Sequence, residues 1–141
     1  MKTLSLLLLS AAILSAQETP DSQHNTSRSK VLELAGAFAN DGYKIRDGYW
    51  SGILEPGKPR ILAVNLFAGN AYWFSAAALP PARKVSVTLY DENGRPVQGE
   101  VFQDGSTAAA GLLPDASGRY FVRLELVEGD KAEFCLVYSY K

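Results

Sequence analysis

Residues 84–97 read KVSVTLYDENGRPV, and the fold class can be worked out from this stretch. Val85, Val87 and Leu89 alternate with Ser, Thr and Tyr, which is the period-two pattern of a strand with one buried face. The run ends at residues 91–94, Asp-Glu-Asn-Gly, where Asn and Gly readily adopt the positive φ angles of a tight hairpin turn. The stretch therefore predicts a β-hairpin whose return strand covers residues 97–103.

Short alternating runs separated by Gly and Pro continue on both sides of this hairpin. Pro80-Pro81 ends one of them, because proline cannot donate a hydrogen bond to a ladder. About eight strands at even spacing, with no helix between them, predict an all-β fold, an antiparallel β-sandwich or jelly roll. Besides the hairpin, the expected strands are 43–54 with an interruption at Asp47-Gly48, 60–67, 71–79, 107–112, 119–127 and 132–140.

The first 16 residues have the layout of a secretory signal peptide. Lys2 is followed by an apolar run over residues 4–14, and Ala16 is small enough to precede a signal-peptidase cut, although Leu14 leaves the position of the cut open. The apolar run is too short to span a bilayer as a helix. We therefore expect an exported protein, periplasmic or extracellular, with no membrane insertion once residues 1–16 are removed.

A polar segment separates this signal from the folded domain. Residues 17–29 contain Pro20 and show no periodicity, which predicts a flexible leader. A short N-terminal helix is expected over residues 30–40, because Val31, Leu34 and Phe38 recur at helical spacing. The domain over residues 30–141 then consists of this helix and the β-sandwich.

Charge and residue types limit the chemistry that the chain can carry. Fourteen Lys and Arg nearly balance 15 Asp and Glu, so no basic surface for nucleic acid is expected. Cys135 is the sole cysteine, so it has no disulfide partner within the chain, and His24, the sole histidine, lies in the leader. A zinc site or a nucleophilic triad needs more of these residues brought together. We predict no catalytic residues, no metal site and no cofactor.

Three segments resemble the bacterial pre-peptidase C-terminal family of small jelly-roll domains. They are the Gly-led aromatic strand 68–74, the strand and turn 87–94, and the Ser-Gly-x-Tyr strand 117–123. The likeness covers roughly residues 43–140 and concerns a fold rather than an active site. It implies a non-catalytic role in binding, secretion or processing. The chain departs from the family in having Pro81-Ala82-Arg83 where many members carry an acidic run.

The aromatic residues are the best candidates for a binding site. Tyr49 and Trp73 would form a flat platform for a sugar ring or a partner if both faced outward on adjacent strands. In the alternative, Trp50, Tyr72 and Phe74 fill the core and the other rings cover an edge or the helix. Two functions stay open: an exported module that binds a glycan or another exported protein, and a structural or assembly component of a cell-envelope complex.

Overall fold

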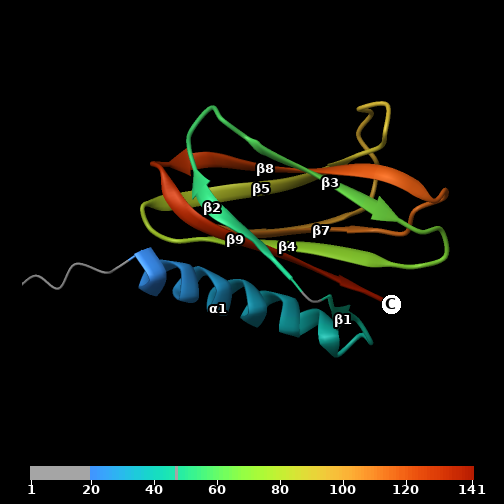
Figure 1. Ribbon diagram of the computed structural model, residues 1–141, viewed down its shortest axis with the longest axis horizontal. Helices are drawn as coiled ribbons and strands as arrows, with labels where there is room; N and C mark the ends of the chain where they lie inside the picture. Colours follow the sequence, from blue (N-terminus) through green and yellow to red (C-terminus); the bar gives the residue numbers. More distant parts are fainter. Residues whose placement is uncertain (1–19, 47) are drawn as a thin grey trace, which may run out of the picture.

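The computed structural model describes residues 20–46 and 48–141, and it has the expected antiparallel β-sandwich fold with one helix (Figure 1). The predicted signal peptide, residues 1–16, lies outside the described residues. The elements are α1 (Pro20–Ala39), β1 (Lys44–Ile45), β2 (Trp50–Leu54), β3 (Arg60–Leu66), β4 (Tyr72–Ala78), β5 (Ala82–Tyr90), β6 (Glu100–Asp104), β7 (Thr107–Leu112), β8 (Gly118–Gly129) and β9 (Ala132–Tyr140).

The strands form two antiparallel sheets. The larger has the order β1-β9-β4-β7-β6, with β2 also paired to β9, and the smaller has the order β3-β8-β5. β1 and β2 pair with successive parts of β9, so together they form the strand that the sequence predicted over 43–54 in two pieces. Counted in this way, the sandwich has the eight strands expected.

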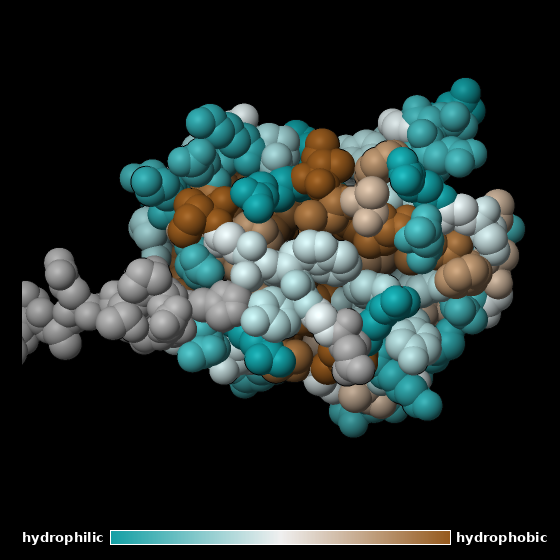
Figure 2. Space-filling view, in the orientation of Figure 1, coloured by the Kyte–Doolittle hydropathy of each residue, from teal (hydrophilic) through white to brown (hydrophobic). Residues whose placement is uncertain are grey.

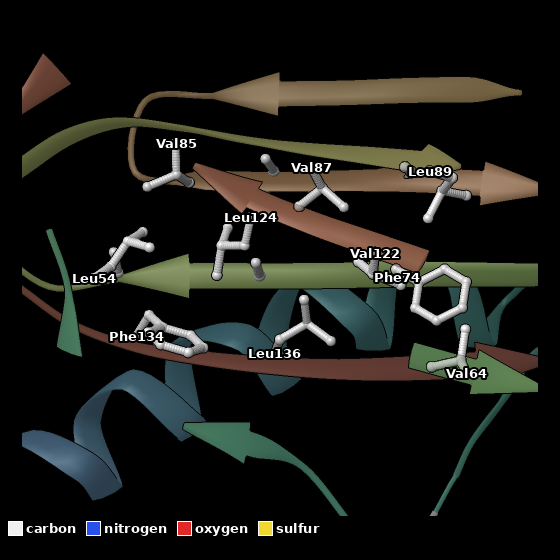
Figure 3. Packing of buried hydrophobic residues seen from close by; sticks show 14 of the residues in the cluster. Leu54, Val64, Phe74, Val85, Val87, Leu89, Val122, Leu124, Phe134 and Leu136 are labelled. Atoms are coloured by element: carbon white, nitrogen blue, oxygen red, sulfur yellow. The ribbon is translucent and has the colours of Figure 1, made fainter. Parts of the chain in front are cut away.

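Alternating side chains fill the space between the two sheets. Val85, Val87 and Leu89 of β5 point inward, as the sequence pattern predicted, and meet Phe74 and Leu136 of the larger sheet (Figure 3). All of these side chains are buried, and burial of apolar side chains is the main source of stability in such a domain. The hairpin stretch therefore contributes one wall of the core.

The return arm of that hairpin differs from the prediction. After the turn at residues 91–94, Val97 donates one backbone hydrogen bond to Leu89 (3.0 Å), and the chain then leaves β5. β6 begins at Glu100 and pairs with β7 of the larger sheet, not with β5. The strand predicted over 97–103 is therefore present from Glu100 onward, but its expected pairing with β5 as the return arm of the hairpin is wrong. Gly99 permits the crossing, because a Cβ at this position would overlap the carbonyl oxygen of Gly111 in β7.

The helix also differs from the prediction, since it begins at Pro20 and has 20 residues. The flexible leader expected over 17–29 is wrong for residues 20–29, and the helix is not confined to 30–40. Ser27, Val31 and Ala35, four residues apart, are buried against the outer face of the larger sheet. This packing stabilises a segment whose composition alone gives no helical pattern.

The described helix does not resemble a membrane span: nowhere in the described part of the chain is there a helix with the length and apolar character required to cross a bilayer.

The helix α1 packs on the outside of the sandwich. Figure 1 shows α1 lying along the layer that contains β4, β7 and β9, with β3, β5 and β8 on the opposite side. The described residues thus form three layers, in which α1 covers the outer face of the larger sheet over β9 and β4.

Candidate binding site at the end of the helix

The two aromatic residues predicted to form a platform do not lie on one surface. Trp73 faces away from the core, but α1 covers it, so that only 8% of the residue is exposed and its ring stacks on Phe38 at 4.3 Å between centroids. Tyr49 is 40% exposed and precedes β2, which β9 separates from β4. Its ring lies 4.7 Å from the guanidinium carbon of Arg28. The predicted Tyr49–Trp73 platform is therefore wrong.

The alternative assignment of the aromatic residues is confirmed. Tyr72 and Phe74 belong to the core, and Trp50 packs against it from the edge. Trp50 stacks on Tyr138 with centroids 5.8 Å apart, and Phe74 lies 5.3 Å from the same ring. These rings are committed to packing within the sandwich.

A hollow opens on the outer face of the larger sheet beyond the C-terminal end of α1. Its volume is about 380 Å³, which falls in the range of small-molecule sites. Trp73 is among its lining residues, so one of the two predicted residues does line a candidate site. The lining residues are Tyr43, Ala71, Tyr72, Trp73, Gln98, Gly99, Glu100, Gly111, Leu112 and Leu113.

Glycines form the floor of this hollow. Gly111 lies between Trp73 of β4 and Glu100 of β6 in one row across three strands, so these three residues share a face of the sheet. A Cβ on Gly111 would come within 2.9 Å of the indole ring, and one on Gly99 would overlap the carbonyl oxygen of Gly111. The floor is therefore main chain, and the absence of side chains at these two positions lets the Trp73 ring and the neighbouring backbone pack closely against it.

Tyr43 forms the wall opposite β6, and two contacts hold it in place. The ammonium group of Lys141 lies 4.6 Å from the centre of the Tyr43 ring and donates a hydrogen bond to the carbonyl oxygen of Asp41 (2.8 Å). The indole N–H of Trp73 hydrogen-bonds to the phenol, and an indole can only donate. A phenol can both donate and accept, so Tyr43 brings a polar group as well as a ring to the hollow.

The electrostatics keep this phenol neutral. Burial raises the pKa of Tyr43 above its usual value, the hydrogen bond from Trp73 opposes that rise, and the carboxylates of Glu100 and Asp41 raise the pKa further. Glu100 and Gln98 are exposed at the rim. The hollow therefore offers one phenol donor, one carboxylate acceptor and one amide that both donates and accepts.

This set of groups suits a neutral polyhydroxylated ligand. Hydroxyl groups can bond the carboxylate, the amide and the phenol, and the apolar face of a sugar ring can lie against an aromatic side chain. The carboxylates of Glu100 and Asp41 repel phosphates and acidic sugars. The geometry provides for recognition by contact.

Sequence reasoning missed Tyr43, Gln98 and Glu100 as site residues. One signal was present: Gly99 lies inside an expected strand, where glycine marks a bulge or a close approach of another backbone. What could not be read from the sequence is that β6 crosses to the larger sheet and thereby places Glu100 in one row with Trp73, on the other side of Gly111.

The side of the sandwich formed by β2 and β3 is a second surface of interest. Figure 2 shows apolar surface gathered over these two strands, whereas the region of α1 is mainly hydrophilic in this view. Ile53 of β2 and Ile61 of β3 are exposed there. The guanidinium carbon of Arg60 lies 5.5 Å from the Phe134 ring and partly covers the edge of the core.

Comparisons with known proteins assign no family. No family model matches the sequence, and no match to a curated protein is found. The resemblance to pre-peptidase C-terminal domains stays a prediction. Among the residues that the structure describes, no group of three or more His, Cys, Asp or Glu side chains is placed to hold a metal ion.

Proposed function

We propose that this protein is an exported, non-catalytic β-sandwich module that binds a neutral saccharide unit in the Tyr43–Glu100 hollow. The proposal rests on the hollow itself, which combines a glycine floor, an aromatic wall and a polar rim. Export is inferred from the signal-like residues 1–16. An accessory role beside exported enzymes agrees with the resemblance to pre-peptidase C-terminal domains.

Each residue has a distinct role in this proposal. Tyr43 packs its ring against the sugar and donates its phenol proton to a hydroxyl oxygen. Glu100 accepts hydrogen bonds from two neighbouring hydroxyl groups, and bonds to a charged acceptor are the stronger ones. Gln98 adds a donor and an acceptor on the same side. Trp73 holds the Tyr43 phenol in place and forms part of the floor.

The test is a glycan-array screen of residues 17–141, followed by calorimetry with each glycan that binds. Tyr43→Ala and Glu100→Gln are each expected to weaken binding by about tenfold or more, which corresponds to about 1.4 kcal/mol. Glu100→Gln is nearly isosteric and removes the charge alone, so a large effect would identify a charge-assisted bond.

Tyr49→Ala is the matched control, since it removes an exposed tyrosine outside the hollow. The Tyr49→Ala variant should bind each glycan with the same affinity as the unchanged protein. If every glycan fails to bind, or if Tyr43→Ala binds glycans as well as Tyr49→Ala does, the saccharide proposal is wrong.

A second candidate function, assembly into a cell-envelope complex, is favoured by the apolar β2–β3 side. Ile53 and Ile61 expose apolar surface on two strands at the ends of their sheets. Surfaces of this kind commonly contact other proteins. Ile61→Asp should then abolish co-purification with exported partners while glycan binding is retained.

A further inference from the structure

The split hairpin leaves one edge of the smaller sheet without a neighbouring strand. An eight-stranded jelly roll divides its strands roughly equally between two sheets. Here the smaller sheet has three, β3-β8-β5, because β6 pairs with β7 instead of β5. β5 and β6 are therefore the terminal strands of different sheets. They adjoin at one end only, where the Gln103 side chain donates to the carbonyl oxygen of Val85 (2.8 Å).

The hydrogen bonds of β5 show which backbone groups face this gap. The N–H of Val85 donates to Gly105 (3.1 Å), and the carbonyl of Leu89 accepts from Val97 (3.0 Å), both on the side away from β8. Backbone groups alternate between the two edges of a strand, so the N–H and C=O of Val87 point the same way. In the described part of the chain, no ladder residue pairs with Val87 on that side.

An apolar opening lies beside Val87, between the two sheets. Its volume is about 170 Å³, several times the roughly 30 Å³ that a water molecule takes in the liquid. Val101 of β6 borders the opening. It pairs with Ala110, whose side chain faces the core, so Val101 projects to the same face, yet 74% of the residue is exposed. Its apolar walls come from both sheets and the crossing segment: Val87, Leu89, Val97, Val101, Ala108 and Ala110.

We propose that this opening binds a peptide segment of a partner protein, which docks one aliphatic residue opposite Val87 through a single antiparallel backbone pair. The N–H and C=O of that residue pair with those of Val87. Its side chain enters the opening, because directly paired residues in an antiparallel ladder project to the same face.

The backbone pair at Val87 is what selects a peptide over other apolar ligands. A lipid chain or a hydrocarbon would fill the opening but would leave a donor and an acceptor without partners, which costs free energy. One peptide residue satisfies both groups at strand spacing. The gap is bounded by the Val85 and Leu89 hydrogen bonds, so recognition centres on a single residue of the partner.

The probe is a phage-displayed library of random linear heptapeptides, selected on residues 17–141. Selected peptides should carry a central aliphatic residue, and adding them should slow hydrogen exchange of the Val87 amide by about tenfold or more. Val101→Arg places a charge at the mouth and should weaken peptide binding by at least about tenfold. Ile61→Arg changes another exposed aliphatic residue, on the β2–β3 side, and should leave binding unchanged.

Three outcomes would overturn this proposal. In the first, every selected peptide binds the Val101→Arg variant as well as it binds the unchanged protein. In the second, bound peptides leave the hydrogen-exchange rate of the Val87 amide unchanged. In the third, the Val87 amide becomes protected as the protein concentration rises without peptide, which would assign the opening to a second copy of the protein. Tyr43→Ala should bind the selected peptides normally. The peptide and saccharide proposals can therefore fail independently.

Discussion

Gly99 and Gly111 lie face to face where β6 meets β7, and side chains at either position would occupy space already taken. A Gly99→Ala Cβ would overlap the Gly111 carbonyl oxygen, so the crossing segment must shift. We expect this substitution to lower the free energy of unfolding by about 1–3 kcal/mol, as measured by urea denaturation. It should also weaken binding in the hollow, because the floor moves.

Gly36→Ala provides the matched control for this prediction. Gly36 lies on the exposed face of α1, and a Cβ there would meet nothing within 4 Å. Alanine in a helix should raise stability by about 0.5–1 kcal/mol. Equal destabilisation by both substitutions would show that the backbone contact at Gly99 is not the cause.

Single residues also show what the sequence could predict. Alternation correctly placed Tyr72 and Phe74 in the core and Trp73 on the opposite face. It could not tell whether that opposite face meets water or another element, since this depends on where α1 docks. Trp73 was for that reason assigned to an exposed platform, and Tyr43, which follows the helix, was overlooked.

At the scale of elements, α1 is attached to the sandwich by a small apolar cluster, by hydrogen bonds that the Lys30 ammonium group donates to Ala78 and Ser106, and by one aromatic stack. Phe38→Ala removes the ring that covers Trp73, so we expect a loss of about 2 kcal/mol of unfolding free energy and a red shift of tryptophan fluorescence. Phe67→Ala truncates a ring that is 57% exposed and should change stability by less than about 0.5 kcal/mol. Equal effects would mean that the stack contributes little.

The elements that the sequence predicted well are those fixed by local alternation. β5, β8 and β9 fall close to their expected ranges because each pattern of buried and polar residues is continuous. The two errors are non-local. Residues 20–29 are helical because Ser27 and Val31 pack on distant strands, and β6 leaves β5 because Gly99 allows a close approach to Gly111.

At the scale of the whole molecule, the three layers are joined unequally. One large cluster of buried side chains fills the space between the sheets. A separate and much smaller cluster joins α1 to the larger sheet, and it consists of Val31, Ala35, Ala77, Cys135 and Val137, with Leu32 packed against it. Because few apolar groups hold the outer layer, α1 should undock at a lower free energy than the sandwich unfolds.

Cys135 reports on this undocking, since its buried side chain lies in the cluster beneath α1. The pKa of the thiol is raised to about 11, chiefly by burial. Arg28 and a backbone hydrogen bond at Leu136 oppose the rise, and the carboxylate of Glu133 adds to it. At pH 8 the docked thiol is therefore protonated and shielded, and a disulfide reagent should react with it only after α1 lifts.

We expect the free energy of the opening that exposes Cys135 to the reagent, obtained from the labelling rate, to be smaller than the free energy of global unfolding. It should also depend less steeply on urea concentration. Phe38→Ala should speed labelling by about tenfold or more because it weakens the docked state, while Phe67→Ala should leave the rate unchanged. Identical free energies and urea slopes for labelling and global unfolding would instead show that helix and sandwich unfold as one unit. The contacts between α1 and the larger sheet would then be as stable as those between the two sheets, although the cluster beneath α1 is small.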